Sequence, residues 1–280
     1  MKVGVHVSIA GKIHQAVDRA KELGCDTFQI FSRSPRSWRT KKLEKSEAEE
    51  FCKRRKAAKI GPVIVHIPYL INLASPLETL YRRSISAYIE DIKRAEMLSA
   101  EYFVTHIGNH KGKGENYGIS RITRALNQII SRTKPHLKIL LENTAGGGTV
   151  LGYNFEQIAT IIKGAKENKY FGLCLDTAHA YGAGYDIATK RGLDKTLKKI
   201  DELVGINRLF LIHANDCKAP LGSHVDRHED IGKGEIGKEG FALIVNHPAL
   251  RKLPFILETP KKRPNEDIEN LKAIRALEKK

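Results

Sequence analysis

Short apolar runs rich in Val, Ile, Leu and Phe recur along the whole chain. A short continuous run of this kind, bounded by polar stretches, predicts a strand that is buried on both faces, as in a parallel sheet. Eight strands are therefore predicted, at residues 3–7, 27–31, 63–66, 102–106, 138–142, 172–176, 208–213 and 254–258.

The segments between these runs have apolar residues at helical spacing and charged outer faces. The clearest of them lie at residues 43–59, 78–98, 155–165, 193–203 and 268–277. Alternating strands and helices predict an α/β fold, and eight such units predict closure into a (β/α)8 TIM barrel. The length of 280 residues suits one such barrel, so we expect a single domain over residues 1–280. An open doubly wound sheet is the alternative.

Six of the predicted strands end in a residue type that binds metal ions. These residues are His66, His106, Glu142, Asp176, His213 and Glu258. One such residue alone would be explained as a polar cap at the barrel rim. In a parallel barrel, however, the carboxyl ends of all strands meet at one mouth, where catalytic groups lie. The six together favour a shared pocket of imidazoles and carboxylates.

Three further residues extend this set. His179 follows Asp176 by three positions, and Asp226 and His228 lie in the loop after the seventh predicted strand. Carboxylates crowded in a desolvated pocket repel each other and take up protons, so the set requires cations. Zinc usually takes four ligands, and nine candidates therefore predict two or three ions. Imidazole and carboxylate ligands without thiolates suit zinc, with Mn²⁺ or iron as substitutes, and paired ions suit phosphoester cleavage.

Net charge and the distribution of apolar residues indicate which binding partner and which cell compartment to expect. The formal net charge of +16, from 48 Lys and Arg against 32 Asp and Glu, favours a polyanionic partner such as nucleic acid. A generally basic surface would account for the charge equally well. The amino-terminal residues read as a strand, and no apolar run is long enough to span a bilayer, so we expect a soluble, cytoplasmic protein without membrane contact.

The cysteines argue against a thiolate metal site. They are widely separated and form no Cys-x-x-Cys pair, so neither a zinc ribbon nor a redox dithiol is indicated. We expect buried free thiols at Cys25, Cys52, Cys174 and Cys217.

A series of short motifs resembles, almost from end to end, the endonuclease IV family of type 2 abasic-site endonucleases. The resemblance implies a xylose-isomerase-like TIM barrel and an endonuclease for double-stranded DNA with abasic sites or blocked 3′ ends. The motifs, in chain order, are GVHVS at 4–8, HIPYLINL at 66–73, HIG at 106–108, ENTAG at 142–146, DTAHA at 176–180, HANDCK at 213–218, DRHEDIGKG at 226–234 and ETP at 258–260.

The resemblance also implies a trinuclear zinc cluster that hydrolyses the bond 5′ to the abasic site and leaves a 3′-hydroxyl and a 5′-deoxyribose phosphate. In that family a metal-bridging hydroxide is the nucleophile, and Glu142 would be the catalytic residue that bridges two ions and orients it. The implied ligand sets are His66, His106 and Glu142 for one zinc, Glu142, Asp176, His213 and Glu258 for the second, and His179, Asp226 and His228 for the third.

Two positions match residues that enter the DNA duplex in this family. Arg36 and Tyr69 both follow predicted strands, and a guanidinium and an aromatic ring can fill the gap that an extruded nucleotide leaves. Without the resemblance, Arg36 would be interpreted as a phosphate contact and Tyr69 as loop packing.

We expect the protein to be a monomer.

Two other functions stay open at this point. A metal-dependent sugar isomerase or epimerase of the same barrel superfamily also places Glu, Asp and His at strand ends, and fold alone does not exclude it. A non-catalytic DNA lesion-binding protein with structural zinc is the second. The remaining histidines are expected to be solvated, apart from His6 on the first strand, which faces the barrel without an assigned metal; they are His14, His110, His136, His224 and His247.

Overall fold

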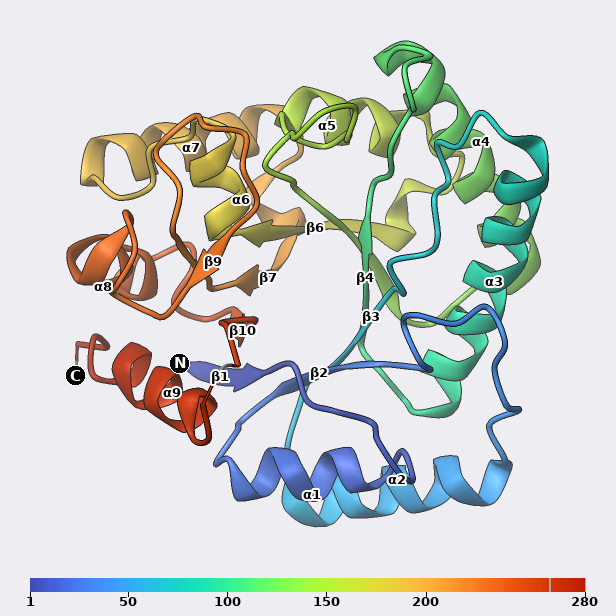
Figure 1. Ribbon diagram of the computed structural model, residues 1–280, viewed down its shortest axis with the longest axis horizontal. Helices are drawn as coiled ribbons and strands as arrows, with labels where there is room; N and C mark the ends of the chain where they lie inside the picture. Colours follow the sequence, from blue (N-terminus) through green and yellow to red (C-terminus); the bar gives the residue numbers. More distant parts are fainter. Residues whose placement is uncertain (262, 280) are drawn as a thin grey trace.

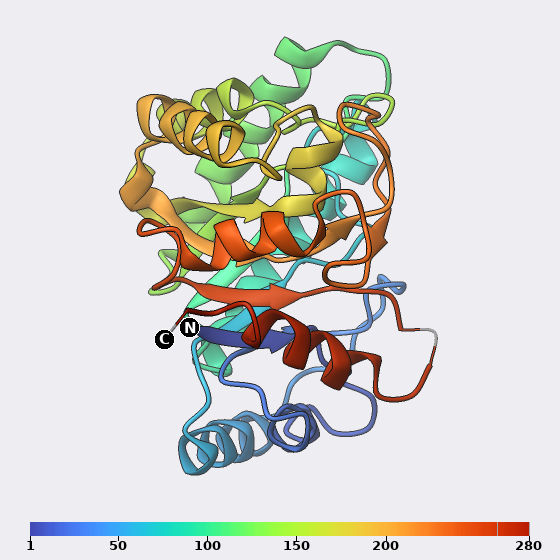
Figure 2. The same ribbon diagram turned by 90° about the vertical axis from the view of Figure 1, so that its left-hand side faces the viewer.

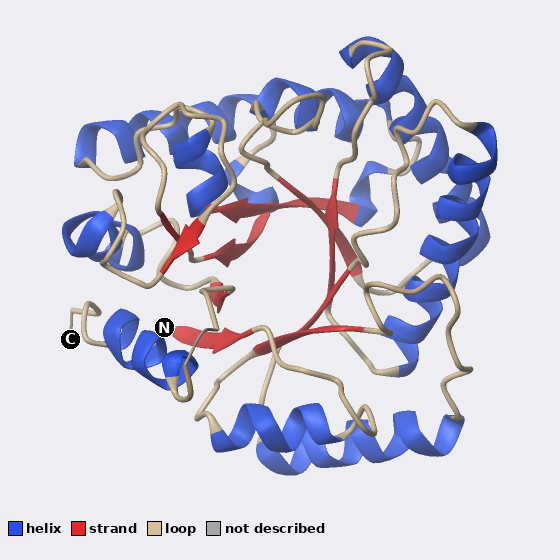
Figure 3. Cartoon of the chain, viewed as in Figure 1, coloured by secondary structure: helices blue, strands red, loops and turns tan. Residues whose placement is uncertain are grey.

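Parallel strands form the centre of the molecule (Figure 3). The structure is a computed structural model that describes residues 1–261 and 263–279. Within these residues the main sheet has eight strands, paired in the order β1-β10-β7-β6-β5-β4-β3-β2. Their bounds are β1 Lys2–Val5, β2 Phe28–Phe31, β3 Val63–His66, β4 Tyr102–His106, β5 Lys138–Glu142, β6 Phe171–Asp176, β7 Leu209–His213 and β10 Pro254–Leu257.

The sheet closes on itself between β1 and β2. His6 and Gln29 form a parallel bridge just beyond β1, and the N–H of Val7 donates to the carbonyl oxygen of Gln29 at 2.8 Å. Glycine is needed at position 4 for this approach, because a Cβ there would lie 1.6 Å from the carbonyl oxygen of Thr27. The predicted TIM barrel is confirmed, and the open doubly wound sheet is wrong.

Helices surround the barrel (Figures 1 and 2). All five helices predicted from the sequence are present with slightly different ends, and further helices that were not predicted complete the ring. In the described part of the chain no helix has both the length and the hydrophobicity to cross a membrane. The bounds are α1 Gln15–Glu22, α2 Lys45–Ala58, α3 Glu78–Met97, α4 Glu115–Thr133, α5 Phe155–Gly164, α6 Thr177–Gly182, α7 Lys190–Leu203, α8 Gly237–Asn246 and α9 Glu266–Arg275, with short 3₁₀ helices at Asn168–Tyr170 and Ile206–Arg208.

The barrel interior is layered along the strands. One apolar side chain from each of six strands fills the inside and is fully buried; these are Ile64, Val104, Leu140, Cys174, Leu211 and Ile256. Successive side chains of a strand point to opposite faces, so the residue two positions later points inward again. In each of these strands that next inward residue is one of the six predicted metal ligands. The apolar layer is therefore the floor on which the candidate site lies.

The cysteines are free thiols, as expected. Cys25, Cys174 and Cys217 are buried, whereas Cys52 on α2 is only half-buried, which differs from the prediction.

Candidate metal centre

The nine predicted ligands lie together at the carboxyl-terminal mouth of the barrel. Their side chains form three groups in which one donor atom from each residue lies within 4.8 Å of the others. The groups are His66, His106 and Glu142; Glu142, Asp176, His213 and Glu258; and Asp176, His179 and His228. Asp226 lies beside the third group.

Glu142 faces two of these groups with different oxygen atoms. Its Oε2 lies 3.2 Å from Nε2 of His66 and 3.4 Å from Nε2 of His106. Its Oε1 lies 2.9 Å from Nδ1 of His213. The Glu142 side chain is fully buried at the end of β5. One carboxylate can thus serve two neighbouring ions.

His213 also approaches the two remaining carboxylates of the second group. Its Nδ1 is 3.2 Å from Oε2 of Glu258 and 4.0 Å from Oδ2 of Asp176. Glu258 follows the last residue of β10, and its own N–H donates to the side-chain oxygen of Asn215 at 2.7 Å. This bond holds Glu258 at the barrel end although it lies outside the strand.

A single helical turn brings His179 into the third group. Asp176 caps helix α6 by accepting the N–H of His179 at 2.7 Å, which satisfies a free donor at the helix start. The three-residue spacing noted in the sequence is therefore a cap and one turn. Asp176 also lies within both the second and the third groups, whereas the sequence analysis assigned it to the second alone.

A small hairpin carries His228. It consists of β8 Asp216–Cys217 and β9 His228–Glu229, where the sequence analysis expected only a loop. The buried carboxylate of Asp216 accepts backbone N–H groups of Cys217, Gly232, Gly234 and Ile236 at 2.8–3.0 Å and so anchors the hairpin.

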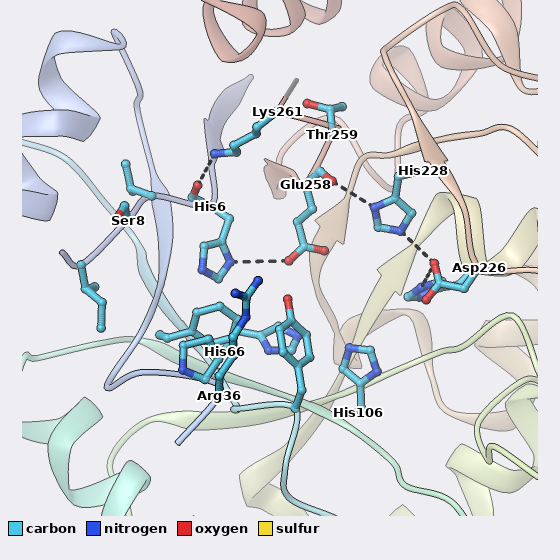
Figure 4. Close-up of a pocket in the computed structure, with 16 residues that line it drawn as sticks. His6, Ser8, Arg36, His66, His106, Asp226, His228, Glu258, Thr259 and Lys261 are labelled. Carbon is cyan, nitrogen blue, oxygen red and sulfur yellow. Dashed lines mark hydrogen bonds and ion pairs between the residues drawn. The ribbon is translucent and has the colours of Figure 1, made fainter. Parts of the chain in front are cut away.

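Asp226 stands at the outer edge of the site. Its Oδ1 lies 3.3 Å from Nε2 of His179 and 3.5 Å from Nε2 of His228. Its side chain is 60% exposed, in contrast to the fully buried Glu142 and Asp176. Figure 4 shows Asp226 and His228 on one side of the pocket.

Main-chain carbonyl groups orient three of the imidazoles. His66 donates from Nδ1 to the carbonyl oxygen of Ile67 at 2.7 Å, His179 to that of Asn143 at 2.9 Å, and His228 to that of Glu258 at 3.0 Å. A neutral imidazole with its hydrogen on Nδ1 has its lone pair on Nε2. In each of these rings Nδ1 carries a hydrogen, so Nε2 is the nitrogen that can bind a metal ion when the ring is neutral.

Charge in the pocket is balanced between imidazoles and carboxylates. Burial alone would raise the pKa of Glu142, but the neighbouring His213 and His106 hold it well below its ordinary value. Burial opposes protonation of His179, yet Asp176 and Asp226 outweigh it and raise the His179 pKa to about 10. Glu142 therefore stays ionised and draws positive charge toward it, which a metal cation can supply in place of a proton.

The donor set fits zinc. Imidazole nitrogens and carboxylate oxygens are ordinary zinc ligands. The Nε2 atom of His228 is buried and has no hydrogen-bond partner among the described residues, as expected of a nitrogen reserved for a metal.

Six of the nine predicted ligands, namely His66, His106, His179, Asp226, His228 and Glu258, line a cavity of about 650 Å³. Its walls include the two predicted DNA contacts, Arg36 and Tyr69, together with His6 and Lys261. Tyr69 is 68% exposed and packs edge-on against Phe31, with ring centroids 5.3 Å apart. Arg36 projects over the cavity (Figure 4). Both side chains can therefore reach a macromolecule at the mouth.

Helix α3 holds the loop that carries Arg36. Arg33 forms a two-point ion pair with Asp91 at 2.8 and 2.9 Å, and both side chains are buried. Arg94, one turn further along α3, donates to the carbonyl oxygens of Ser32 and Lys41. The loop is thus fixed at both ends.

Sequence reasoning missed Gln29, a fully buried residue of β2 whose amide contacts His213 and Glu258. Its only sequence signal is a polar residue within an apolar run. The five histidines expected in solvent lie outside the three groups, but the expectation is wrong for several of them. His14 is half-buried, and its Nδ1 is buried without a hydrogen-bond partner among the described residues. His110, His224 and His247 have protein partners. Their rings contact the N–H of Gly114, the carbonyl of Ala145 and the carboxylate of Asp194, respectively.

Comparison with known proteins finds the same architecture and close relatives. Residues 17–278 match the family model described as xylose isomerase-like TIM barrel. The chain is 45% identical over 280 residues to a protein named probable endonuclease 4 from Methanosphaerula palustris, covering 99% of this chain and 98% of the relative. It is 42% identical to the protein of the same name from Halothermothrix orenii, covering 98% and 99%.

Solved structures agree. Endonuclease IV from Thermus thermophilus superposes with a TM-score of 0.88 at 36% identity, covering 99% of this chain and 98% of that one. A D-tagatose 3-epimerase-like protein superposes with a TM-score of 0.75 at 21% identity, covering 99% and 97%. At that identity the second likeness concerns the barrel fold only.

Proposed function

Because the chain belongs to the endonuclease IV family of xylose isomerase-like TIM barrels, we propose that it is a DNA repair endonuclease specific for abasic sites. It would hydrolyse the phosphodiester bond 5′ to the abasic site in double-stranded DNA and leave a 3′-hydroxyl and a 5′-deoxyribose phosphate. The observation that carries the proposal is three ligand groups, linked through Glu142 and Asp176, whose members include residues lining an open cavity.

Three zinc ions would occupy these groups, with Mn²⁺ as a possible substitute. The ligand sets would be His66, His106 and Glu142; Glu142, Asp176, His213 and Glu258; and His179, Asp226 and His228. Bound zinc would supply a hydroxide at neutral pH and positive charge for the phosphate oxygens.

The protein's own residues would hold the reacting groups in place. Glu142 would fix two ions relative to each other, since its two oxygens face different ligand groups. No Ser or Cys nucleophile is needed for direct hydrolysis by this route. The buried ligands exclude bulk water from the floor, and the cavity above them can receive an extruded sugar phosphate.

Selectivity would come from the cavity mouth. An abasic nucleotide has lost stacking and pairing, so its extrusion costs less than that of an intact nucleotide. Arg36 and Tyr69, both at the mouth, would fill the gap left in the duplex. A net charge of +16 would support binding to the DNA backbone.

A duplex oligonucleotide with one tetrahydrofuran abasic analogue tests the proposal, because this analogue cannot undergo β-elimination. The zinc-loaded protein should cut immediately 5′ of the analogue and leave an undamaged duplex intact, and Glu142→Gln should abolish incision. An uncut duplex with zinc or manganese fully loaded would refute the endonuclease. Tight binding without incision would then identify a lesion-binding protein, whereas no binding would favour a sugar substrate.

A further inference from the structure

His213 is oriented differently from the imidazoles that main-chain carbonyls hold. Its Nδ1, and not its Nε2, faces the carboxylates of Glu142 and Glu258, at 2.9 and 3.2 Å. Its Nε2 points away from the ligand group and lies 2.9 Å from Oε1 of Gln29. The partner that orients His213 is thus a side chain.

The amide of Gln29 has partners for all its polar atoms. Its Nε2 lies 2.6 Å from Oε1 of Glu258 and 3.0 Å from Nδ1 of His6. With the amide reversed, its carbonyl oxygen would face the Glu258 carboxylate, and two acceptors cannot share a hydrogen bond. The amide nitrogen therefore faces Glu258 and the amide oxygen faces His213.

This orientation fixes the hydrogen of His213. An amide oxygen can only accept, so Nε2 of His213 must carry the hydrogen that it shares with Gln29. The lone pair of a neutral ring is then on Nδ1, which faces the ligand group. At the same time Gln29 engages Oε1 of Glu258 and leaves Oε2, the atom nearer His213, for a metal ion.

We propose that Gln29 is a positioning residue for the second metal site: it makes His213 a ligand through Nδ1 and Glu258 a ligand through Oε2. The inference rests on the proposed function, which supplies the ion. Partners that orient a metal ligand in this way typically change metal affinity by about 10- to 100-fold when they are removed.

Zinc titration of the metal-free protein against a chelating dye tests the role of Gln29 without measuring catalysis. Gln29→Met keeps the length of the side chain and removes the contacts of the amide with His213, Glu258 and His6. The variant should bind one of the zinc ions about 10- to 100-fold more weakly and bind the others with unchanged affinity. Unchanged affinities for all ions would overturn the inference.

Gln157→Met is the matched control. Gln157 on α5 is also buried, and its side-chain oxygen accepts the N–H of Gly152 at 2.6 Å, but it contacts none of the predicted ligands. This variant should lose as much stability as a variant without a buried amide does, while its zinc affinity stays at the wild-type value. An equal loss of zinc in both variants would show a general effect of destabilisation and would also overturn the inference.

A spectrum of the wild-type protein keeps the inference testable if Gln29→Met does not fold. Long-range ¹H–¹⁵N spectra of the zinc-loaded protein distinguish the two ring nitrogens. His213 should show a protonated Nε2 and a metal-bound Nδ1, and His66, His179 and His228 the reverse. A metal-bound Nε2 on His213 would refute the role of Gln29.

These results are separable from the test of the proposed function. If the wild-type protein binds zinc with the expected His213 spectrum but does not cut the tetrahydrofuran duplex, the endonuclease function is refuted and the inference about Gln29 still stands. If the wild-type protein cuts this duplex and Gln29→Met leaves all zinc affinities unchanged, the endonuclease function is supported and the positioning role of Gln29 is refuted.

Discussion

Exposure separates the side chains of the site that support folding from those that do not. Glu142 and Asp176 are fully buried, whereas Tyr69 is 68% exposed and the Asp226 side chain 60% exposed. Substitution of an exposed side chain away from packing and capping sites changes stability little. Tyr69 and Asp226 are therefore positions where function can be changed while the fold is kept.

Tyr69→Ala should weaken binding to the abasic duplex by about 1–3 kcal/mol, the usual contribution of one aromatic ring stacked on a base. Zinc content and melting temperature should stay as in the wild type. Fluorescence anisotropy with the abasic duplex measures the affinity. Tyr117→Ala on α4 is the control, since Tyr117 is 37% exposed and does not line the cavity. Equal losses in the two variants would contradict a specific role of Tyr69.

Asp226→Asn should lose one zinc ion per chain and retain the other two. The first two ligand groups do not contain Asp226, and its contacts are with the third group alone, through His179 and His228. Atomic emission after gel filtration gives the zinc content. Asp194→Asn is a matched control on α7, because Asp194 is also partly exposed but pairs with Lys190 and His247. Retention of all zinc by Asp226→Asn would remove it from the ligand set.

At this scale the sequence predicted the residues that local position defines. A strand end places a candidate ligand such as Glu142 at the mouth because side chains alternate inward and outward along the strand. Gln29 escaped prediction because its partners His213 and Glu258 lie 184 and 229 residues away along the chain. Only barrel closure brings them together.

Helix α3 links the barrel wall to the cavity mouth. Its residues Asp91 and Arg94 bind the start and end of the loop that presents Arg36, and Arg83 stacks over Trp38 at 4.4 Å in the same loop. The buried ion pair between Asp91 and Arg33 leaves an uncompensated charge if one partner is removed. The position of the loop therefore depends on α3.

Asp91→Asn should destabilise the protein by about 3–5 kcal/mol, because it leaves Arg33 buried without a counter-charge. The midpoint of urea denaturation measures the loss. Glu49→Gln removes a carboxylate of the same kind from the exposed pair with Lys45, whose side chains are 66% and 88% exposed. Exposed pairs contribute about 0–1 kcal/mol, so this control should unfold almost as the wild type does. Similar losses of stability in both variants would contradict the stabilising role of the buried ion pair between Arg33 and Asp91.

Elements with a long periodic pattern were predictable, and elements defined by tertiary contacts were not. The strands follow from short continuous apolar runs, and α3 follows from apolar residues at helical spacing. Helix α6 has six residues, too few for a periodic pattern, and starts because Asp176 caps it. The β8–β9 hairpin has two residues in each strand and depends on the buried Asp216.

The whole molecule combines a barrel mouth with a strongly basic charge. The eight strands of the main sheet run parallel, so the predicted ligands from His66 to Glu258 meet at one end (Figures 1 and 3). In the proposed function the net charge of +16 would attract the DNA backbone, whose phosphates are the same in damaged and intact duplexes. Affinity and selectivity should therefore come from different parts of the molecule.

Raising the salt concentration should lower affinity for abasic and undamaged duplexes in parallel. If the protein neutralises 6–10 phosphates, the loss between 50 and 200 mM salt is about 10³- to 10⁵-fold. Anisotropy with the Glu142→Gln protein measures both duplexes without incision. A salt-independent affinity would show that the basic charge does not face the DNA.

Arg36→Ala in the same measurement separates two roles for this side chain at the mouth. A phosphate contact would be lost from both duplexes alike and would reduce the slope of log affinity against log salt by about one in each. A guanidinium that fills the gap beside an extruded nucleotide has nothing to fill in an intact duplex. We therefore expect the loss of affinity to be confined to the abasic duplex. Equal losses of affinity for both duplexes would show that Arg36 contacts only the DNA phosphates.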